Sequence, residues 1–425
     1  MKKTLMALAV GAAFAAPAAY ADVTLSGAIN MGIEYLNVGG GNNPTAGNSI
    51  RTGNSGQSLS TFGVQSNYSN VTITSVDDLG GGLKLDFAFQ MVAPTNNNTT
   101  VSNRNSHIGL VSESWGGVWY GTNENIYERY LYSIDPLDGA AGLGGNLQIM
   151  GNPGAGSVFD AARGNPANTA GSRAGFYRRD EQVIWYDSPN YSGVTFGAAV
   201  GTNYADNSCA ATFTGTCNTS PWMWQAGVKY VGTSMPLQLW GAYNNHKDYY
   251  GLADITANQT GLNATGGQVA GTRSNDRAVQ LGVGYTLGDI FMFANYETLQ
   301  YKINGSVAGV GPLANPVIRY TRDAWGLGVK WNLASGYVGG QFISALKGDC
   351  TTLTGACNAG NTAAKMFGLG YYHTMSKQTQ IYTVFSWLGN DDLANYKTAG
   401  IGNAASGVNI GADYTGFGVG IKHSF

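Results

Sequence analysis

Residues 416–425 read GFGVGIKHSF and close the chain with a strict alternation of side-chain types. Phe417, Val419 and Ile421 occupy odd positions, while glycine, lysine and serine occupy the even ones. A period of two residues is typical of a β-strand, because successive side chains point to opposite faces of the sheet. The segment therefore predicts a strand with one apolar face and one polar or very small face, ending on the aromatic residue Phe425.

The same alternation recurs along the chain in segments of about ten residues, which is a usual strand length in a β-barrel. Residues 22–35 (DVTLSGAINMGIEY) show it, and residues 83–91 (LKLDFAFQM) place Lys84 and Asp86 opposite the apolar side chains. Further segments begin at Val194, Leu237 and Trp325. The pattern predicts an all-β fold.

Short turns and long polar segments alternate between these strands. Seven connections are tight, at residues 77–82, 113–117, 188–193, 231–236, 286–289, 333–336 and 374–378. Eight are long, at residues 37–57, 93–104, 124–179, 205–221, 245–275, 302–321, 344–363 and 389–415. This interleaving predicts about sixteen antiparallel strands in a single domain, with short turns at one end and long loops at the other.

The chain begins with MKKTLMALAVGAAFAAPAAYA, residues 1–21. Two lysines, an apolar stretch and small residues at Ala19 and Ala21 follow the order of a secretory signal peptide. A membrane anchor is the alternative, but the apolar stretch is short for a span of ~20 residues. We therefore expect a signal peptide at residues 1–21 and one barrel domain at residues 22–425.

The composition is unusual for a water-soluble globule. Charged residues make up 11% of the chain, glycine accounts for 63 of 425 residues, and the net charge is −2. A net acidic chain with no basic cluster argues against nucleic acid as a partner. Beyond residue 21 no apolar run reaches the ~18 residues of a transmembrane helix.

A closed transmembrane β-barrel reconciles these features. In lipid every backbone N–H and C=O must be paired within the protein, so a strand protein spans the membrane only if its sheet has no edge. The last strand would then pair with the first, apolar side chains would face lipid and polar ones a water-filled interior. A soluble β-sandwich or propeller is the alternative, with its apolar face buried inside.

The four cysteines form two local pairs, Cys209 with Cys217 and Cys350 with Cys357. In an exported chain, close pairs of this kind predict two disulfides that each fix a small loop. A metal site is the alternative, but these spacings do not match those of zinc sites and have no nearby histidines. We expect no metal and no cofactor.

The sequence resembles the Gram-negative general porin family, in its β-proteobacterial branch. The resemblance is carried by DVTLSGAINMGIEY, DDLGGGLKLDFAFQM, SNRNSHIGLVSESWGGVWYGTNEN, VIWYDSPNYSGVTFGAAV and the closing GIKHSF. It implies a sixteen-stranded outer-membrane barrel that forms a homotrimer among lipid and lipopolysaccharide, with a third loop folded into the lumen. It also implies that the strand ending at Phe425 is read by the outer-membrane insertion machinery.

The resemblance identifies residues 124–179 as the third loop, and we expect this loop to narrow the channel. Loops of this length are usually functional or disordered. The candidate constriction residues are acidic groups of the loop together with side chains of inward parity on the wall: Glu124, Glu128, Asp135, Asp138, Lys84, Asp86, Trp185, Lys229 and Lys330. The basic wall positions of the family hold Thr61, Thr122 and Trp185 here, so the sequence leaves ion preference open.

The function expected is passive diffusion of small hydrophilic solutes and ions through a water-filled channel. The alternative is a substrate-specific outer-membrane channel, in which inward Trp185 and Trp240 stack on a ring-shaped solute. A plugged structural barrel or adhesin is a third possibility. Four scattered histidines without a serine partner in phase give no catalytic residues, so we expect no enzyme.

Overall fold

A computed structural model of the chain describes residues 22–39, 58–93, 103–137, 143–154, 174–202, 221–255, 272–305, 317–357, 359–398 and 411–425. The proposed signal peptide at residues 1–21 lies outside the described residues. Among the described residues, no helix is both long and apolar enough to cross a membrane.

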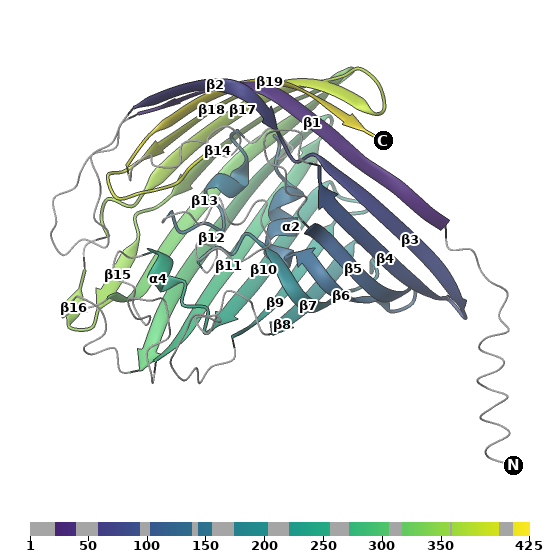
Figure 1. The fold of residues 1–425 in the computed structure, drawn as a ribbon, viewed down its shortest axis with the longest axis horizontal. Helices are drawn as coiled ribbons and strands as arrows, with labels where there is room; N and C mark the ends of the chain where they lie inside the picture. The colour runs from purple at the N-terminus through teal and green to yellow at the C-terminus, as the bar shows by residue number, and fades with distance from the viewer. Residues whose placement is uncertain are drawn as a thin grey trace, which may run out of the picture.

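Antiparallel strands account for nearly all of the described secondary structure (Figure 1). The elements are β1 Asp22–Val38, β2 Leu59–Ser66, β3 Asn70–Gly80, β4 Leu83–Val92, β5 Asn103–Ser112, β6 Gly116–Glu124, α2 Ile126–Tyr132, η1 Asn146–Gln148, β7 Arg179–Asp187, β8 Val194–Thr202, β9 Trp222–Val231, β10 Leu237–Lys247, α4 Leu252–Ile255, β11 Thr272–Leu287, β12 Ile290–Gly305, β13 Val317–Leu333, β14 Gly336–Ala345, β15 Asp349–Thr352, β16 Gly355–Ala356, β17 Ala364–Thr374, β18 Thr379–Asn390 and β19 Tyr414–Ser424.

Two of the barrel strands are interrupted. β2 and β3 both pair with β1, in registers that follow one another, so together they form one strand broken at residues 67–69. β14 and β15 share β13 in the same way, and the two-residue β16 folds back on β15. Counted so, the described residues form sixteen barrel strands, as the sequence predicted.

The barrel is closed by its first and last strands. β1 pairs with β19 from Ala28 opposite Ser424 to Val38 opposite Tyr414. Phe425 extends this ladder, because its N–H donates to the Gly27 carbonyl and its own carbonyl accepts from the Gly27 N–H, both at 3.1 Å. Pairing of the two terminal strands removes the open edges of the described sheet, and with them the usual aggregation hazard.

The alternation seen in the sequence sets the two faces of the wall. On β19, Phe417, Val419 and Ile421 are each about half exposed on the outer face, whereas Gly416 and Gly418 are buried on the inner one. Large apolar side chains are exposed in this way on strands all around the barrel. This distribution is the reverse of a soluble β-sandwich, in which the apolar face is buried.

Seven short turns and eight long loops join the strands, at the places that the sequence predicted. The turn between β3 and β4 shows why glycine is used there, because Gly80, Gly81 and Gly82 all have positive φ. Side chains rarely tolerate this left-handed backbone. Tight turns of this kind hold neighbouring antiparallel strands in register.

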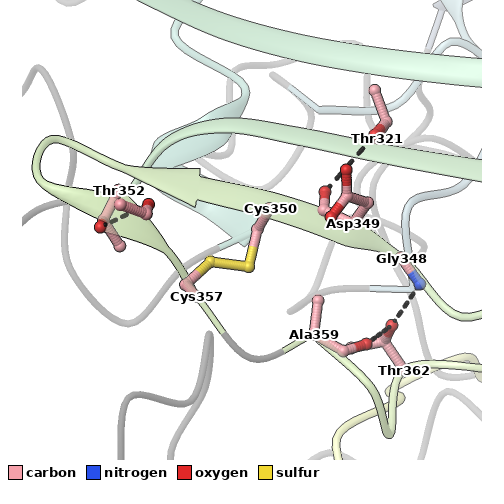
Figure 2. The surroundings of a disulfide bond; sticks show 9 residues. Thr321, Gly348, Asp349, Cys350, Thr352, Cys357, Ala359 and Thr362 are labelled. Atoms are coloured by element: carbon pink, nitrogen blue, oxygen red, sulfur yellow. Dashed lines mark hydrogen bonds between the residues drawn. A yellow bond between two sulfur atoms is a disulfide. The ribbon is translucent and has the colours of Figure 1, made fainter.

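At the long-loop end, a disulfide closes the hairpin of β15 and β16 (Figure 2). It joins Cys350 to Cys357, whose Cα atoms are 5.5 Å apart, as expected from their spacing. The Thr352 hydroxyl donates to the Gly355 carbonyl at 2.8 Å and closes the same turn. The second expected pair, Cys209 with Cys217, lies outside the described residues.

Candidate functional site: a channel narrowed by the third loop

The third loop, between β6 and β7, is described at residues 125–137, 143–154 and 174–178, and these residues carry α2 inside the barrel (Figure 1). Its described residues bond to the inner wall over a wide arc. On β9, Gln225 accepts from the Ile126 N–H at 2.7 Å, and on β11 the Gln280 amide donates to the Tyr127 carbonyl at 2.7 Å. On β14 the Gln341 amide donates to the Gly144 carbonyl at 2.6 Å.

Glycines on the inner wall make room for this loop. A methyl group added at Gly339 on β14 would meet the Pro136 backbone, and one added at Gly368 on β17 would meet Leu137 and Gly144. Gly227 on β9 lies against Ile126 in the same way. Part of the high glycine content thus lets loop backbone approach strand backbone closely.

A buried ion pair fixes the middle of the loop. Arg322 on β13 and Glu297 on β12 bond to each other, and both are 0% exposed. Glu297 also accepts from the Tyr127 hydroxyl and, at 2.8 Å, from the Gly151 N–H. Arg322 donates to the Ile149 carbonyl at 2.9 Å. These loop contacts add hydrogen bonds to the two charges, and a buried ion pair needs such bonds to offset its desolvation.

An open cavity of about 780 Å³ remains between the loop and the opposite wall. Mostly polar residues from β1, the break between β2 and β3, β3, β5, β6, the loop and the end of the chain at β19 line it: Ser26, Gly27, Ala28, Asn30, Asn67, Tyr68, Asn70, Thr72, Arg104, Glu124, Arg129, Tyr132, Ser133, Lys422, Ser424 and Phe425. Polar groups that face an open cavity in this way are typical of an aqueous channel.

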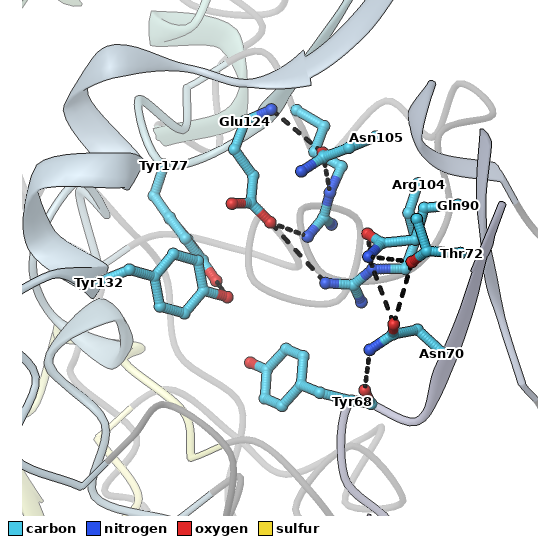
Figure 3. A network of polar contacts seen from close by, with 10 residues as sticks. Tyr68, Asn70, Thr72, Gln90, Arg104, Asn105, Glu124, Tyr132 and Tyr177 are labelled. Atoms are coloured by element: carbon cyan, nitrogen blue, oxygen red, sulfur yellow. Dashed lines mark hydrogen bonds and ion pairs between the residues drawn. The ribbon is translucent and has the colours of Figure 1, made fainter. Parts of the chain in front are cut away.

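Two arginines share one glutamate at the edge of this cavity (Figure 3). Glu124 bonds to Arg179, and the same carboxylate oxygen lies 3.7 Å from Arg104 Nη2. Asn105 accepts from Arg179 at 3.0 Å and from the Glu124 N–H at 3.2 Å, which holds the group together. Because one carboxylate faces two guanidinium groups, the cluster carries an excess of one positive charge.

The loop adds a further cation. Arg129 on α2 makes a bidentate pair with Asp187 on β7, at 2.8 and 3.0 Å. On β9, Lys229 donates to the Ser133 hydroxyl at 2.9 Å, so this predicted lysine contacts the end of α2. Bidentate pairing fixes the orientation of a guanidinium group more strongly than a single contact does.

The acidic candidates of the loop have different environments. Glu128 is 1% exposed, and its Oε2 has no hydrogen-bond partner among the described residues. Burial, and next the charge of Glu124, hold the pKa of the Glu128 carboxyl well above its usual range. Asp135 accepts from the N–H groups of Leu137 and Asn146 at 3.0 Å, so it shapes the loop rather than the open channel. Asp138 lies outside the described residues.

The remaining charged candidates lie away from the cavity lining. Lys84 is half exposed beside the β3–β4 turn, 4.0 Å from Glu113. Asp86 accepts from Trp119 Nε1 at 2.7 Å and lies 3.1 Å from His107 Nε2. Lys330 lies 4.0 Å from the centre of the Tyr337 ring. The structure therefore places these three on the wall but not in the Glu124 cluster.

Neither tryptophan of the aromatic hypothesis offers a free face. Trp185 is 5% exposed, packs in a cluster with Val183 and Met223, and stacks on Trp119 at 5.8 Å. Trp240 is 4% exposed beneath Ile134 of the loop. Their inward parity was predicted correctly, but the loop and neighbouring wall side chains cover them. Trp185 therefore presents little of its ring to the channel in this structure.

Several lining residues were not identified from the sequence. Arg104 lies at the start of β5 next to a long loop, and Tyr68 lies in the break between β2 and β3. Tyr132 ends α2. Arg104 has the parity of the outward-facing Ile108 and Leu110, and a register irregularity between β4 and β5 at this point separates it from that pattern, so parity gave no signal of its place. Within the described parts of the chain, no group of three or more metal-ligating side chains occurs.

Comparison with known proteins agrees with this architecture. The family model of the Gram-negative porins matches residues 7–393. An outer membrane porin protein of Bordetella pertussis is 28% identical, and the outer membrane porin protein 32 of Delftia acidovorans is 27% identical, each over 100% of both chains. The structure of the anion-selective porin from Comamonas acidovorans matches with a TM-score of 0.64 and 20% identity, covering 95% of this chain and 100% of that one. Since the family model spans most of the sequence, the chain belongs to the Gram-negative porin family, the channel-forming barrels of the bacterial outer membrane.

Proposed function

We propose that this porin is a passive diffusion channel for small hydrophilic solutes and ions that favours anions, and that it carries out no chemistry. The observation that carries the preference is the sharing of Glu124 by Arg104 and Arg179 at the edge of the open cavity. The ion pairs at the cavity include more cations than carboxylates: Arg104, Arg129 and Arg179 against Glu124 and Asp187.

Glu128 is not among the side chains that line this cavity, and burial raises the pKa of its carboxyl. A low-dielectric wall focuses the field of fixed charges in a narrow water-filled opening, so a small excess is enough to bias ion passage. The name of the Comamonas neighbour, an anion-selective porin, supports the same preference.

The constriction we propose is the Glu124 cluster with Arg129 and Lys422, bounded by the loop. Lys229 and Asp135 support this constriction because they hydrogen-bond to the loop. Lys84, Asp86 and Lys330 are charges on the channel wall outside the constriction. Glu128 lies buried in α2 and belongs to the packing of the loop, not to the open channel.

Reversal potential in a salt gradient tests this proposal. The purified protein is reconstituted in a planar bilayer with a tenfold gradient of potassium chloride. We expect a potential whose sign shows chloride to be more permeant than potassium. A potential of zero, or one of the opposite sign, would contradict the anion preference.

Family membership also supports three proposals about assembly. We propose a homotrimer that contacts outer-membrane lipid and lipopolysaccharide. We propose that residues 1–21 are removed as a signal peptide during export. Phe425, which is 43% exposed at the end of the closing strand, is proposed as the contact of the insertion machinery. Loss of outer-membrane assembly after deletion of Phe425, with export intact, tests the last of these.

A further inference from the structure

The break between β2 and β3 presents an aromatic side chain to the channel. Tyr68 lies in this break with φ of 57°, a left-handed conformation that is unusual for an aromatic residue. Its ring lines the open cavity. Strained backbone of this kind persists only where the surroundings enforce it, and it is found mainly at functional sites.

Hydrogen bonds to both neighbouring strands enforce the break. On the β1 side, the Asn67 N–H donates to the Asn30 carbonyl at 2.8 Å, and the Asn30 N–H donates to the Ser69 hydroxyl at 2.9 Å. On the β4 side, the Ala93 N–H donates to the Ser69 carbonyl at 2.9 Å. The backbone on each side of Tyr68 is therefore anchored, which keeps its ring in the lumen.

A guanidinium group lies over this ring. Arg104 Cζ is 5.7 Å from the centre of the Tyr68 ring, and Arg104 Nε donates to Gln90 Oε1 at 3.1 Å. Gln90 in turn donates to Thr72 at 3.0 Å. A wall network thus positions the arginine beside the aromatic face, and guanidinium groups bind carboxylates through planar N–H pairs.

The third loop supplies a second aromatic residue and a second cation to the same cavity. Tyr132 and Arg129 lie on α2 and line the cavity with Tyr68 and Arg104. The Tyr132 hydroxyl lies 2.8 Å from the Tyr177 hydroxyl, which orients its ring. Figure 3 shows Tyr68 and Tyr132 facing the space beside the Glu124 cluster from the wall and from the loop.

We propose that this cavity binds aromatic monocarboxylates and passes them in preference to saturated carboxylates of the same charge and size. The carboxylate is held by Arg104 or Arg129, and the ring lies against the faces of Tyr68 and Tyr132. Aromatic pairs favour offset or edge contacts that a saturated ring cannot reproduce. This inference rests on the proposed anion preference, because an anionic solute must first enter the basic region.

The test compares benzoate with cyclohexanecarboxylate, which has the same charge and a similar size but no aromatic face. Each is added to the full-length protein in a planar bilayer, and the concentration that halves the chloride current is measured. We expect benzoate to act at a concentration roughly threefold to tenfold lower, since an aromatic contact contributes ~0.5–1.5 kcal/mol. Equal concentrations for the two acids would overturn the inference.

Three variants test whether the preference for benzoate depends on the rings of Tyr68 and Tyr132. Tyr68→Asn removes the ring while keeping a residue that tolerates positive φ, and Tyr132→Leu removes the ring from the loop. Each is expected to reduce the benzoate preference at least twofold, whereas Tyr68→Phe keeps it. The matched control is Tyr120→Leu on the lipid-facing surface, where Tyr120 is 54% exposed. A benzoate preference unchanged in both Tyr68→Asn and Tyr132→Leu overturns the assignment.

Reversal potential separates this inference from the proposed function. A wild-type channel that favours chloride but does not distinguish the two acids retains the anion preference and overturns the aromatic site. If Tyr68→Asn fails to assemble a folded barrel, Tyr132→Leu decides the outcome, because it lies outside the strand break; an unchanged benzoate preference in that variant then overturns the assignment.

Discussion

Glu297 and Arg322 form an ion pair on the inner wall of the barrel, and both side chains are fully buried beneath the third loop. Other polar atoms of the pair bond to the loop through Tyr127, Gly151 and Ile149. The pair therefore joins β12, β13 and the loop, and it sets how far the loop extends into the channel.

Removing one member of this pair should loosen the loop. Arg322→Met leaves Glu297 as a buried charge without its partner, at a cost of about 3–5 kcal/mol. We expect a lower unfolding temperature in detergent and a noisier single-channel current. The double variant Glu297→Gln with Arg322→Met should be closer to wild type, because no charge is then left unpaired. An Arg322→Met channel as stable and as quiet as wild type would contradict this role.

Neutralising Glu124 should strengthen the anion preference. Glu124→Gln leaves Arg104 and Arg179 without their shared carboxylate. One unit charge at ~5 Å in water changes the local ion population by about threefold to fivefold. The ratio of chloride to potassium permeability should rise by a factor of that order. Lys377→Gln, in the exposed turn after β17, serves as the control and should leave the ratio unchanged.

The buried carboxyl of Glu128 should make stability depend on pH. Its pKa is raised in the folded protein, so the folded state holds the proton more tightly than the unfolded chain, in which glutamate titrates near ~4.3. The contribution of this carboxyl to the free energy of unfolding is therefore fully present below the unfolded pKa. It is lost as the pH rises through the folded pKa. Glu128→Gln should therefore be more stable than wild type at pH 8 and equal to it at pH 4, as measured by thermal unfolding. The same difference at both pH values would refute this linkage.

Glycines of the barrel wall that contact the third loop should not tolerate larger side chains. Gly339→Val introduces atoms where the Pro136 backbone lies and should cost ~1–3 kcal/mol through overpacking. The neighbouring Gly340 is a matched control, because a Cβ there would meet only Leu369 Cδ1 at 3.6 Å and the Gly368 carbonyl oxygen at 3.7 Å. Unfolding in urea should separate the two variants. Equal stability for both would show that the loop is free to shift at this point.

The strands were predictable because water and lipid impose a period of two on every spanning segment. Residues 416–425 illustrate this, since Phe417 and Val419 face outward and Gly418 inward, as their spacing indicates. Closure also followed from the sequence, because an unpaired backbone edge is too costly in hydrocarbon. These constraints act on each strand locally and can therefore be recognised without knowledge of the whole fold.

The channel lining was harder to predict because it depends on contacts between distant segments. Parity places Trp185 inside, yet its burial is decided by Val183, Ala199 and Met223 on three strands. Tyr68 acquires its place from a strand break that Asn30 and Ala93 enforce from both sides. The position of the third loop determines which inward-facing side chains remain in contact with water.

Single-channel recording in a planar bilayer tests the central claim most directly, namely that a loop-narrowed, water-filled path runs through the barrel. We expect discrete conductance steps that rise linearly with voltage and in proportion to the conductivity of the bulk salt. A folded, inserted barrel that produced no steps would show that the third loop closes the lumen, and would contradict the claim.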